Sequence, residues 1–490
     1  LSDAQVESLL YSSEGWFSAV YLNLRTLSEH GTLPERDSDI FTMFTAAMIE
    51  PLLRVVQEDA GILLASLPPS EVPAALDECP ADALKAHPFA LLVLMRSMFN
   101  WRNIPKMLEL KALLLAALEE HPELPAEERG NLLGECDLIM SFLCYNDISA
   151  MSRLHRSASA QMSRPAISIR SSGGWTFGSP SVLMMFYRAP GELAGELAEM
   201  AECMPHYYKI TNGHGQGAET IMRAEAAFVQ GRFTDAHIAL ESAYAQIEGN
   251  GQENMALCCD FLAQRLSRYA EVGPHRSFAE RRTELLRHHN ASWLNLWNAV
   301  SAYCHALRGE MEQIPEVFAE HRLASVSILA PGRPMIEMIE NQVYLAQGAY
   351  AKVIGRSEGL LALCKGVHYA LVALHVRLQA ASAYERLGKR EEAETLLAQA
   401  LADAAPDSIV MPFAENYRYL KPLLAAGPQT ALTARVLALG EAGERRQSGT
   451  VRPAAFAALT EREYALVGLM AQRLTNREIA EKLFLSEGSV

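Results

Sequence analysis

Four glycines at regular intervals constrain the fold of this chain more than any other feature. Gly231, Gly309, Gly348 and Gly388 each follow an apolar stripe at helical spacing, and the gaps between them are 78, 39 and 40 residues. The gap of 78 is twice 39, and the skipped position falls near Ala270, where no glycine stands. Glycine readily adopts the left-handed conformation that ends a helix. The spacing therefore predicts repeated pairs of helices joined at a glycine.

Small or branched apolar residues recur at fixed distances from these glycines. An alanine stands seven residues before three of the glycines: Ala224, Ala302 and Ala381. An apolar residue stands five residues after all four: Ala236, Ile314, Val353 and Ala393. Small side chains let paired helices approach closely. Because neither helix of a pair can bury its apolar face alone, we expect the hairpins to stack into a superhelix. Ordinary helical packing without a repeat is the alternative.

The two clearest copies of this pattern are AEAAFVQGRFTDAHIALESAYAQ, from residue 224, and ASAYERLGKREEAETLLAQAL, from residue 381. They resemble tetratricopeptide-like helical hairpins. Their period exceeds the usual length of about 34 residues, but it is similar to the longer repeats of MalT-like regulators. Strand-like alternation is scarce. The predicted fold class is therefore all-α, with a tetratricopeptide-like helical-repeat superhelix.

The end of the chain, residues 459–490, contains two helix-start signals. Thr460 with Glu463, and Thr475 with Glu478, both follow the S/T-x-x-E pattern of a capping box. Apolar residues at helical spacing follow each signal. Two short helices joined by a tight turn are what a helix-turn-helix requires.

This segment resembles the first two-thirds of a LuxR-type helix-turn-helix. In that family a third helix enters the major groove of DNA, and its first turn corresponds here to the last residues of the chain. The resemblance therefore implies DNA contacts from Ser486, Glu487, Ser489 and Val490. A simple amphipathic hairpin is the alternative.

The start of the second predicted helix is a further candidate DNA contact. Thr475, Asn476 and Arg477 stand there, where backbone amides and short polar side chains can hold a phosphate. Because the chain opens with Leu1 and ends inside the motif, we expect it to be a fragment, or the ordered part of something longer, and the helix-turn-helix to be truncated.

Aromatic residues and glycines interrupt the helical pattern between Gly174 and Glu219. This stretch resembles a segment found in a branch of MalT-like LuxR-type regulators. An effector pocket there would be lined by Trp175, Phe177, Tyr207, Tyr208 and His214. In the alternative, which we favour, the aromatic side chains pack the core and Gly213, Gly215 and Gly217 shape a loop.

The N-terminal stretch SSEGWFSAVYLNLRTL, which contains Gly15 and Trp16, resembles the region that follows the nucleotide-hydrolysing domain of these regulators. The predicted organisation has five parts. Residues 1–67 are a remnant of that winged-helix or arm region, and residues 68–170 are a helical arm or the first repeats. Residues 171–439 are the sensor repeats, residues 440–458 are a glycine-rich charged linker, and residues 459–490 are the truncated helix-turn-helix.

Composition narrows the class of protein. The net charge of −15 argues against a general nucleic-acid coat or a protein of anionic membrane surfaces, but it allows a small DNA-binding module. Eight cysteines without a C-x-x-C pair indicate reduced, buried thiols in a cytosolic protein. The sequence shows no transmembrane run and no signal peptide, so we expect a cytoplasmic protein without a membrane partner.

Catalytic and cofactor motifs are missing from these residues. The sequence contains no G-x-x-x-x-G-K-[ST] phosphate loop, no H-E-x-x-H metal motif and no catalytic constellation. We therefore expect no enzyme activity and no cofactor, with ATP bound only if an upstream domain exists. The predicted function is a bacterial transcription regulator that binds double-stranded DNA, senses a small-molecule or protein effector and self-associates. The alternative is a helical-repeat interaction scaffold without DNA binding, in which Leu466, Leu469 and Ile479 would pack on the repeats.

Overall fold

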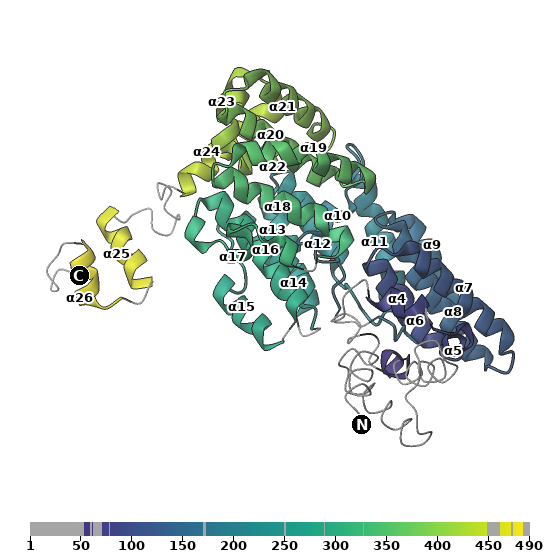
Figure 1. The fold of residues 1–490 in the computed structure, drawn as a ribbon. Coiled ribbons are helices and arrows are strands. Elements are labelled where there is room, and N and C mark those ends of the chain that lie inside the picture. The colour runs from purple at the N-terminus through teal and green to yellow at the C-terminus, as the bar shows by residue number, and fades with distance from the viewer. Residues whose placement is uncertain are drawn as a thin grey trace, which may run out of the picture. The chain divides into compact units, whose positions relative to one another are not determined.

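The computed structural model describes a helical protein (Figure 1). The described residues are 53–58, 61, 71–77, 79–169, 173–248, 251–288, 290–326, 328–447, 461–471 and 474–483. All regular secondary structure within these ranges is helical, which confirms the all-α prediction. Within the same ranges, no helix combines the length and apolar character needed to cross a membrane.

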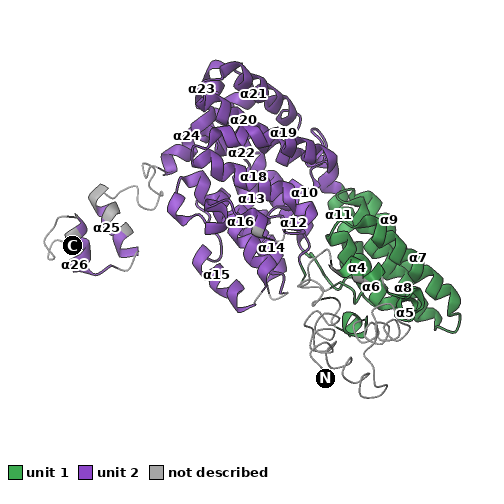
Figure 2. Ribbon diagram, in the orientation of Figure 1, with its two compact units in different colours: residues 1–173, 199–216 green, residues 174–198, 217–490 purple. Residues whose placement is uncertain are grey.

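The chain divides into two compact units (Figure 2). The first comprises residues 1–173 and 199–216, and the second comprises residues 174–198 and 217–490. Helix α11, Leu193–Ile210, contributes to both because the division falls within it.

The other helices of the first unit begin at well-defined caps. The Asn103 side chain accepts a hydrogen bond from the Lys106 amide at 3.2 Å, and Asp147 accepts one from the Ala150 amide at 2.8 Å. Such caps satisfy amides that have no partner inside the helix. The helices are α4 Glu71–Asp77, α5 Ala81–Lys85, α6 Pro88–Asn100, α7 Ile104–Glu120, α8 Ala126–Ser141, η2 Phe142–Cys144 and α9 Ile148–Gln161.

The second unit contains the four regularly spaced glycines. Its helices up to residue 404 are α10 Val182–Phe186, α12 Ala218–Val229, α13 Phe233–Ile247, α14 Glu253–Leu266, α15 Phe278–Arg287, α16 Ala291–Arg308, η3 Met311–Gln313, α17 Glu316–Ala319, η4 Leu323–Ser325, η5 Ala330–Gly332, α18 Arg333–Ala346, α19 Tyr350–Gly366, α20 Ala370–Arg386 and α21 Arg390–Ala404. They are followed by α22 Met411–Glu415, α23 Tyr417–Ala426 and α24 Ala431–Gln447.

The four glycines end helices as predicted. Gly231, Gly309, Gly348 and Gly388 follow α12, α16, α18 and α20, with φ values of 71°, 77°, 78° and 72°. The helices on either side of three of these turns contact each other, as α12 with α13, α18 with α19 and α20 with α21. All seven small or branched residues of the pattern are buried: Ala224, Ala236, Ala302, Ile314, Val353, Ala381 and Ala393.

The first helices of successive pairs form a continuous row. Helix α12 contacts α14, α14 contacts α16, α16 contacts α18, and α18 contacts α20. Helix α14 occupies the skipped position and ends at Leu266 without a glycine. After Gly309 the partner helix is reduced to η3 and the four-residue α17, which begins directly after Pro315. The first helices of the pairs therefore follow one another regularly, whereas their partner helices differ in length.

The last helix of the predicted sensor region runs past Gly440, the residue at which the sequence predicts the linker to start. Helix α24 continues to Gln447, and Gly440 and Gly443 are buried within it. A Cβ atom at Gly440 would overlap the ring of Tyr417, and one at Gly443 would lie 2.7 Å from Cε1 of Tyr269. These glycines therefore allow close packing between α24 and two aromatic rings, although glycine is a poor helix former. Residues 448–460 lie outside the described residues.

Candidate functional site

Two short helices stand where the sequence predicts the DNA-binding motif. Helix α25 spans Glu461–Ala471, and α26 spans Asn476–Leu483, which is about two turns. The two helices contact each other. The amide of Leu474 donates to the Leu469 carbonyl of α25 at 3.4 Å.

The second predicted capping box is formed. The amide and the hydroxyl of Thr475 both donate to Oε2 of Glu478, at 2.8 and 2.7 Å. In return, the Glu478 amide donates to the Thr475 hydroxyl at 3.4 Å. The bonds from the backbone and the side chain of Thr475 lower the pKa of the Glu478 carboxyl. The charged form of Glu478 thus fixes the start of α26.

Burial divides α26 into two faces. Ile479 and Ala480 are 0% and 5% exposed, whereas Asn476, Arg477 and Lys482 are exposed. Met470, at the end of α25, is 56% exposed and so departs from the apolar stripe that the sequence suggests. The polar first turn of α26 therefore points outward from a small apolar contact.

Three of the predicted DNA contacts come together on that turn. Thr475, Asn476 and Arg477 are consecutive and exposed. An exposed helix start that carries an amide and a guanidinium group can bind a phosphate, although the Glu478 carboxylate reduces the positive charge there. The other four predicted contacts lie outside the described residues: Ser486, Glu487, Ser489 and Val490. Thr460 of the first predicted capping box also lies outside them.

Two of the predicted effector-pocket residues, Trp175 and Phe177, belong to the second unit. Trp175 is buried and stacks on Phe186, with ring centroids 5.3 Å apart. Thr176, which lies between Trp175 and Phe177, is held by Asn254. The side-chain oxygen of Asn254 accepts hydrogen bonds from the amide and the hydroxyl of Thr176, at 3.2 and 3.1 Å. The geometry is that of an aromatic residue packed in a core.

The other three, Tyr207, Tyr208 and His214, belong to the first unit. The Tyr207 hydroxyl and Nδ1 of His214 are 2.6 Å apart, and the ring of His155 lies 4.9 Å from that of Tyr207. Burial lowers the pKa of His155 to about 3 and that of His214 to about 4. Gly213, Gly215 and Gly217 all have positive φ values, so they shape the loop that carries His214.

A buried ion pair occupies the centre of the second unit. Nε and Nη2 of Arg265 donate to the two oxygens of Glu415, at 2.7 and 2.9 Å, and both side chains are almost fully buried. The guanidinium carbon lies 4.8 and 5.0 Å from the ring centroids of Phe228 and Phe261. Burial alone would lower the pKa of Arg265, but the charge and hydrogen bonds of Glu415 raise it above its usual value. The pair is therefore charged and joins α14 to α22.

A chain of hydrogen-bonded neutral side chains lies beside this ion pair. The Gln379 side-chain amide donates to Gln342 at 2.9 Å, and the Gln342 amide donates to Asn416 at 3.0 Å. Asn416 directly follows Glu415, so the junction of α22 and α23 is held by polar side chains of α14, α18 and α20. Sequence reasoning missed this centre because its members are far apart in the chain, 150 residues for Arg265 and Glu415.

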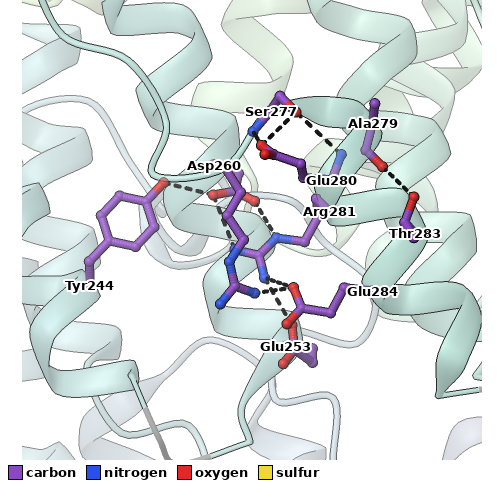
Figure 3. A network of polar contacts seen from close by, with 10 residues as sticks. Tyr244, Glu253, Asp260, Ser277, Ala279, Glu280, Arg281, Thr283 and Glu284 are labelled. Atoms are coloured by element: carbon purple, nitrogen blue, oxygen red, sulfur yellow. Dashed lines mark hydrogen bonds and ion pairs between the residues drawn. The ribbon is translucent and has the colours of Figure 1, made fainter.

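A second charged network holds α15 (Figure 3). Nε of Arg281 donates to Asp260 at 2.6 Å, and Nη1 donates to Glu253 and Glu284 at 3.1 and 3.0 Å. The Tyr244 hydroxyl donates to the other oxygen of Asp260 at 2.7 Å. The charged groups of this network are paired with one another, so we assign the network a structural role.

The described residues contain no cluster of His, Cys, Asp and Glu side chains suited to hold a metal ion. All eight cysteines are free, and six of them are buried. Burial raises the pKa of several thiols, for example Cys136 to about 11 and Cys364 to about 12, so these thiols are protonated and unreactive. No protein-family profile and no curated protein matches the chain.

Proposed function

We propose that this chain is a cytoplasmic, DNA-binding transcription regulator of the MalT-like LuxR type. Helices α25 and α26 are part of its DNA-binding module, and the helical hairpins form a tetratricopeptide-like superhelix that senses a small molecule or a protein. Effector binding promotes self-association, which brings DNA-binding modules together on adjacent sites. The chain has no catalytic role and needs no cofactor of its own in this proposal.

The observation that carries the proposal is the capped helix pair. The Leu474 amide donates to the Leu469 carbonyl of α25, and the reciprocal bonds between Thr475 and Glu478 start a two-turn helix with an exposed polar first turn. An isolated helix of this length is marginal in water, so its cap and its contact with α25 indicate a built motif.

The proposal predicts that the first turn of α26 contacts DNA. In the full-length native protein, Asn476→Ala combined with Arg477→Ala should weaken specific binding by about tenfold or more, because contacts to phosphate or base edges are lost. The slope of log affinity against log salt should fall by about one for a lost phosphate contact. Fluorescence anisotropy over a salt series measures both quantities.

Lys482→Ala is the matched control, because it removes one positive charge from the other end of the same helix. It should change affinity much less than the double variant. Equal effects from Lys482→Ala and the double variant would show that only net charge matters and would remove the first turn of α26 from the interface. Circular dichroism checks that the repeats stay folded in each variant.

A further inference from the structure

A groove of about 850 Å³ lies within the second unit, between α21, α23 and the start of α24. Its volume lies in the range of small-molecule sites, which is about 300–1,000 Å³. Most of its lining is apolar, and the main side chains are Leu397, Leu401, Leu423, Leu424 and Leu432.

Small residues of α21 form part of the groove wall, beside the larger Glu394, Leu397 and Leu401. Ala398, Ala402 and Ala405 line it at a spacing of four and three residues, which places them on one face of the helix. On the opposite side, α23 ends at Ala426, and Gly427 and Pro428 form the turn into α24. The sequence therefore leaves an apolar hollow beside three helices.

A single guanidinium group marks one end of the groove. Arg435 of α24 is exposed and lines the groove, and its Nη2 donates to the Gln230 carbonyl at 2.6 Å. Among the described residues, no carboxylate forms an ion pair with it. The acidic residue of the lining, Glu394, pairs with Arg390 at 2.7 Å, and Arg390 also pairs with Glu385 at 3.3 Å. The electrostatics of the groove therefore favour an anion beside Arg435.

We propose that this groove binds a small aliphatic carboxylate. The hydrocarbon body would lie on the leucines and alanines, where the burial of apolar surface stabilises it. The carboxylate would accept charge-assisted hydrogen bonds from Arg435. A role of this ligand as the effector rests on the sensing function proposed above. The binding of the ligand to the groove does not depend on that function.

The test is isothermal titration calorimetry of the whole chain with decanoate, below the concentration at which it forms micelles, and with decanol as the uncharged probe. We expect saturable binding of decanoate and at least about tenfold weaker binding of decanol, because decanol cannot accept a charge-assisted hydrogen bond from Arg435. Arg435→Gln should weaken decanoate binding by the same factor while keeping a donor for the Gln230 carbonyl.

Two further variants test the place of binding. Ala402→Phe fills the groove and should abolish binding, and Ala398→Phe serves if the first variant fails to fold. Arg445→Gln removes a charge from the same helix outside the groove and should leave the affinity unchanged. Absence of saturable binding, or binding that neither Arg435→Gln nor the filling variants weaken, would overturn the proposal. Decanoate binding by a protein that does not bind DNA would refute the regulator function alone.

Discussion

The buried polar centres described for the two units differ in charge. In the first unit, His155, Tyr207 and His214 are packed together, and burial lowers the pKa of both histidines far enough to keep them neutral. In the second unit, Arg265 and Glu415 are both charged and pair through two hydrogen bonds. A buried polar group must either lose its charge or find a partner for it. The two centres should therefore fail under different perturbations.

The largest effect is expected from breaking the charged centre. Arg265→Met leaves the Glu415 carboxylate buried without its partner, which should lower the free energy of unfolding of the second unit by about 3–5 kcal/mol. Hydrogen exchange followed by mass spectrometry, peptide by peptide, measures this loss for α14, α20 and α22.

The double variant Arg265→Met with Glu415→Met provides the control for that experiment. Because it removes both charges and keeps apolar volume, it should be much less destabilised than Arg265→Met alone. Equal losses in the single and double variants would mean that packing, and not charge pairing, stabilises this centre.

Acid should act more strongly on the neutral centre, which holds two buried histidines, than on the second unit, where burial lowers the pKa of the single His375 to about 3. In the unfolded chain a histidine has a pKa of about 6.5, whereas the folded values are about 3 for His155 and about 4 for His214. Below pH 6.5 the unfolded state therefore binds more protons, and the stability of the first unit falls as the pH falls towards 4. By pH 5 the loss should be about 2 kcal/mol for each histidine.

Hydrogen exchange of the first unit between pH 7 and pH 5, corrected for the intrinsic exchange rate, tests this prediction. His155→Gln should flatten the dependence, since it removes one of the two titrating groups. A first unit as stable at pH 5 as at pH 7 would show that its histidines accept protons in the folded state.

A smaller effect separates two uses of glycine in the second unit. Gly440→Ala places a methyl group against the ring of Tyr417 and should cost about 1–3 kcal/mol. Gly388→Ala meets no atom within 4 Å but keeps a φ of 72°, so it should cost about 1 kcal/mol. Thermal unfolding of both variants measures the difference.

Tyr417→Ala gives the discriminating control for these glycines, because it removes Cγ and Cδ2, the two ring atoms that the new methyl group would overlap. It should relieve most of the cost of Gly440→Ala and leave that of Gly388→Ala unchanged, because only the first cost comes from a contact with Tyr417. Relief of both costs, or of neither, would contradict the distinction.

The same contrast explains which features the sequence could predict. The helix ends at Gly231, Gly309, Gly348 and Gly388 and the capping box of Thr475 with Glu478 depend on residues close in the chain, so short patterns reveal them. Gly440 looks like a linker residue because its reason for being glycine is Tyr417, which comes from another helix. Arg265 gives no signal of its partner, Glu415, since only the folded structure brings them together.

The candidate site shows the same division. The start of α26 was predictable residue by residue, from Thr475 to Glu478. The groove beside Arg435 was not, because its walls come from α21, α23 and α24, and each of these helices taken alone looks like an ordinary amphipathic helix.

The most direct test of the regulator function is specific DNA binding by the full-length native protein. Binding to its own upstream region is compared with binding to a shuffled sequence of equal composition, over a salt series. The account predicts tighter binding to the upstream region, by about 10³-fold or more, with an affinity that falls steeply as salt rises. Equal affinity for both sequences, with or without effector and nucleotide, would contradict it and favour a helical-repeat scaffold that captures a protein partner.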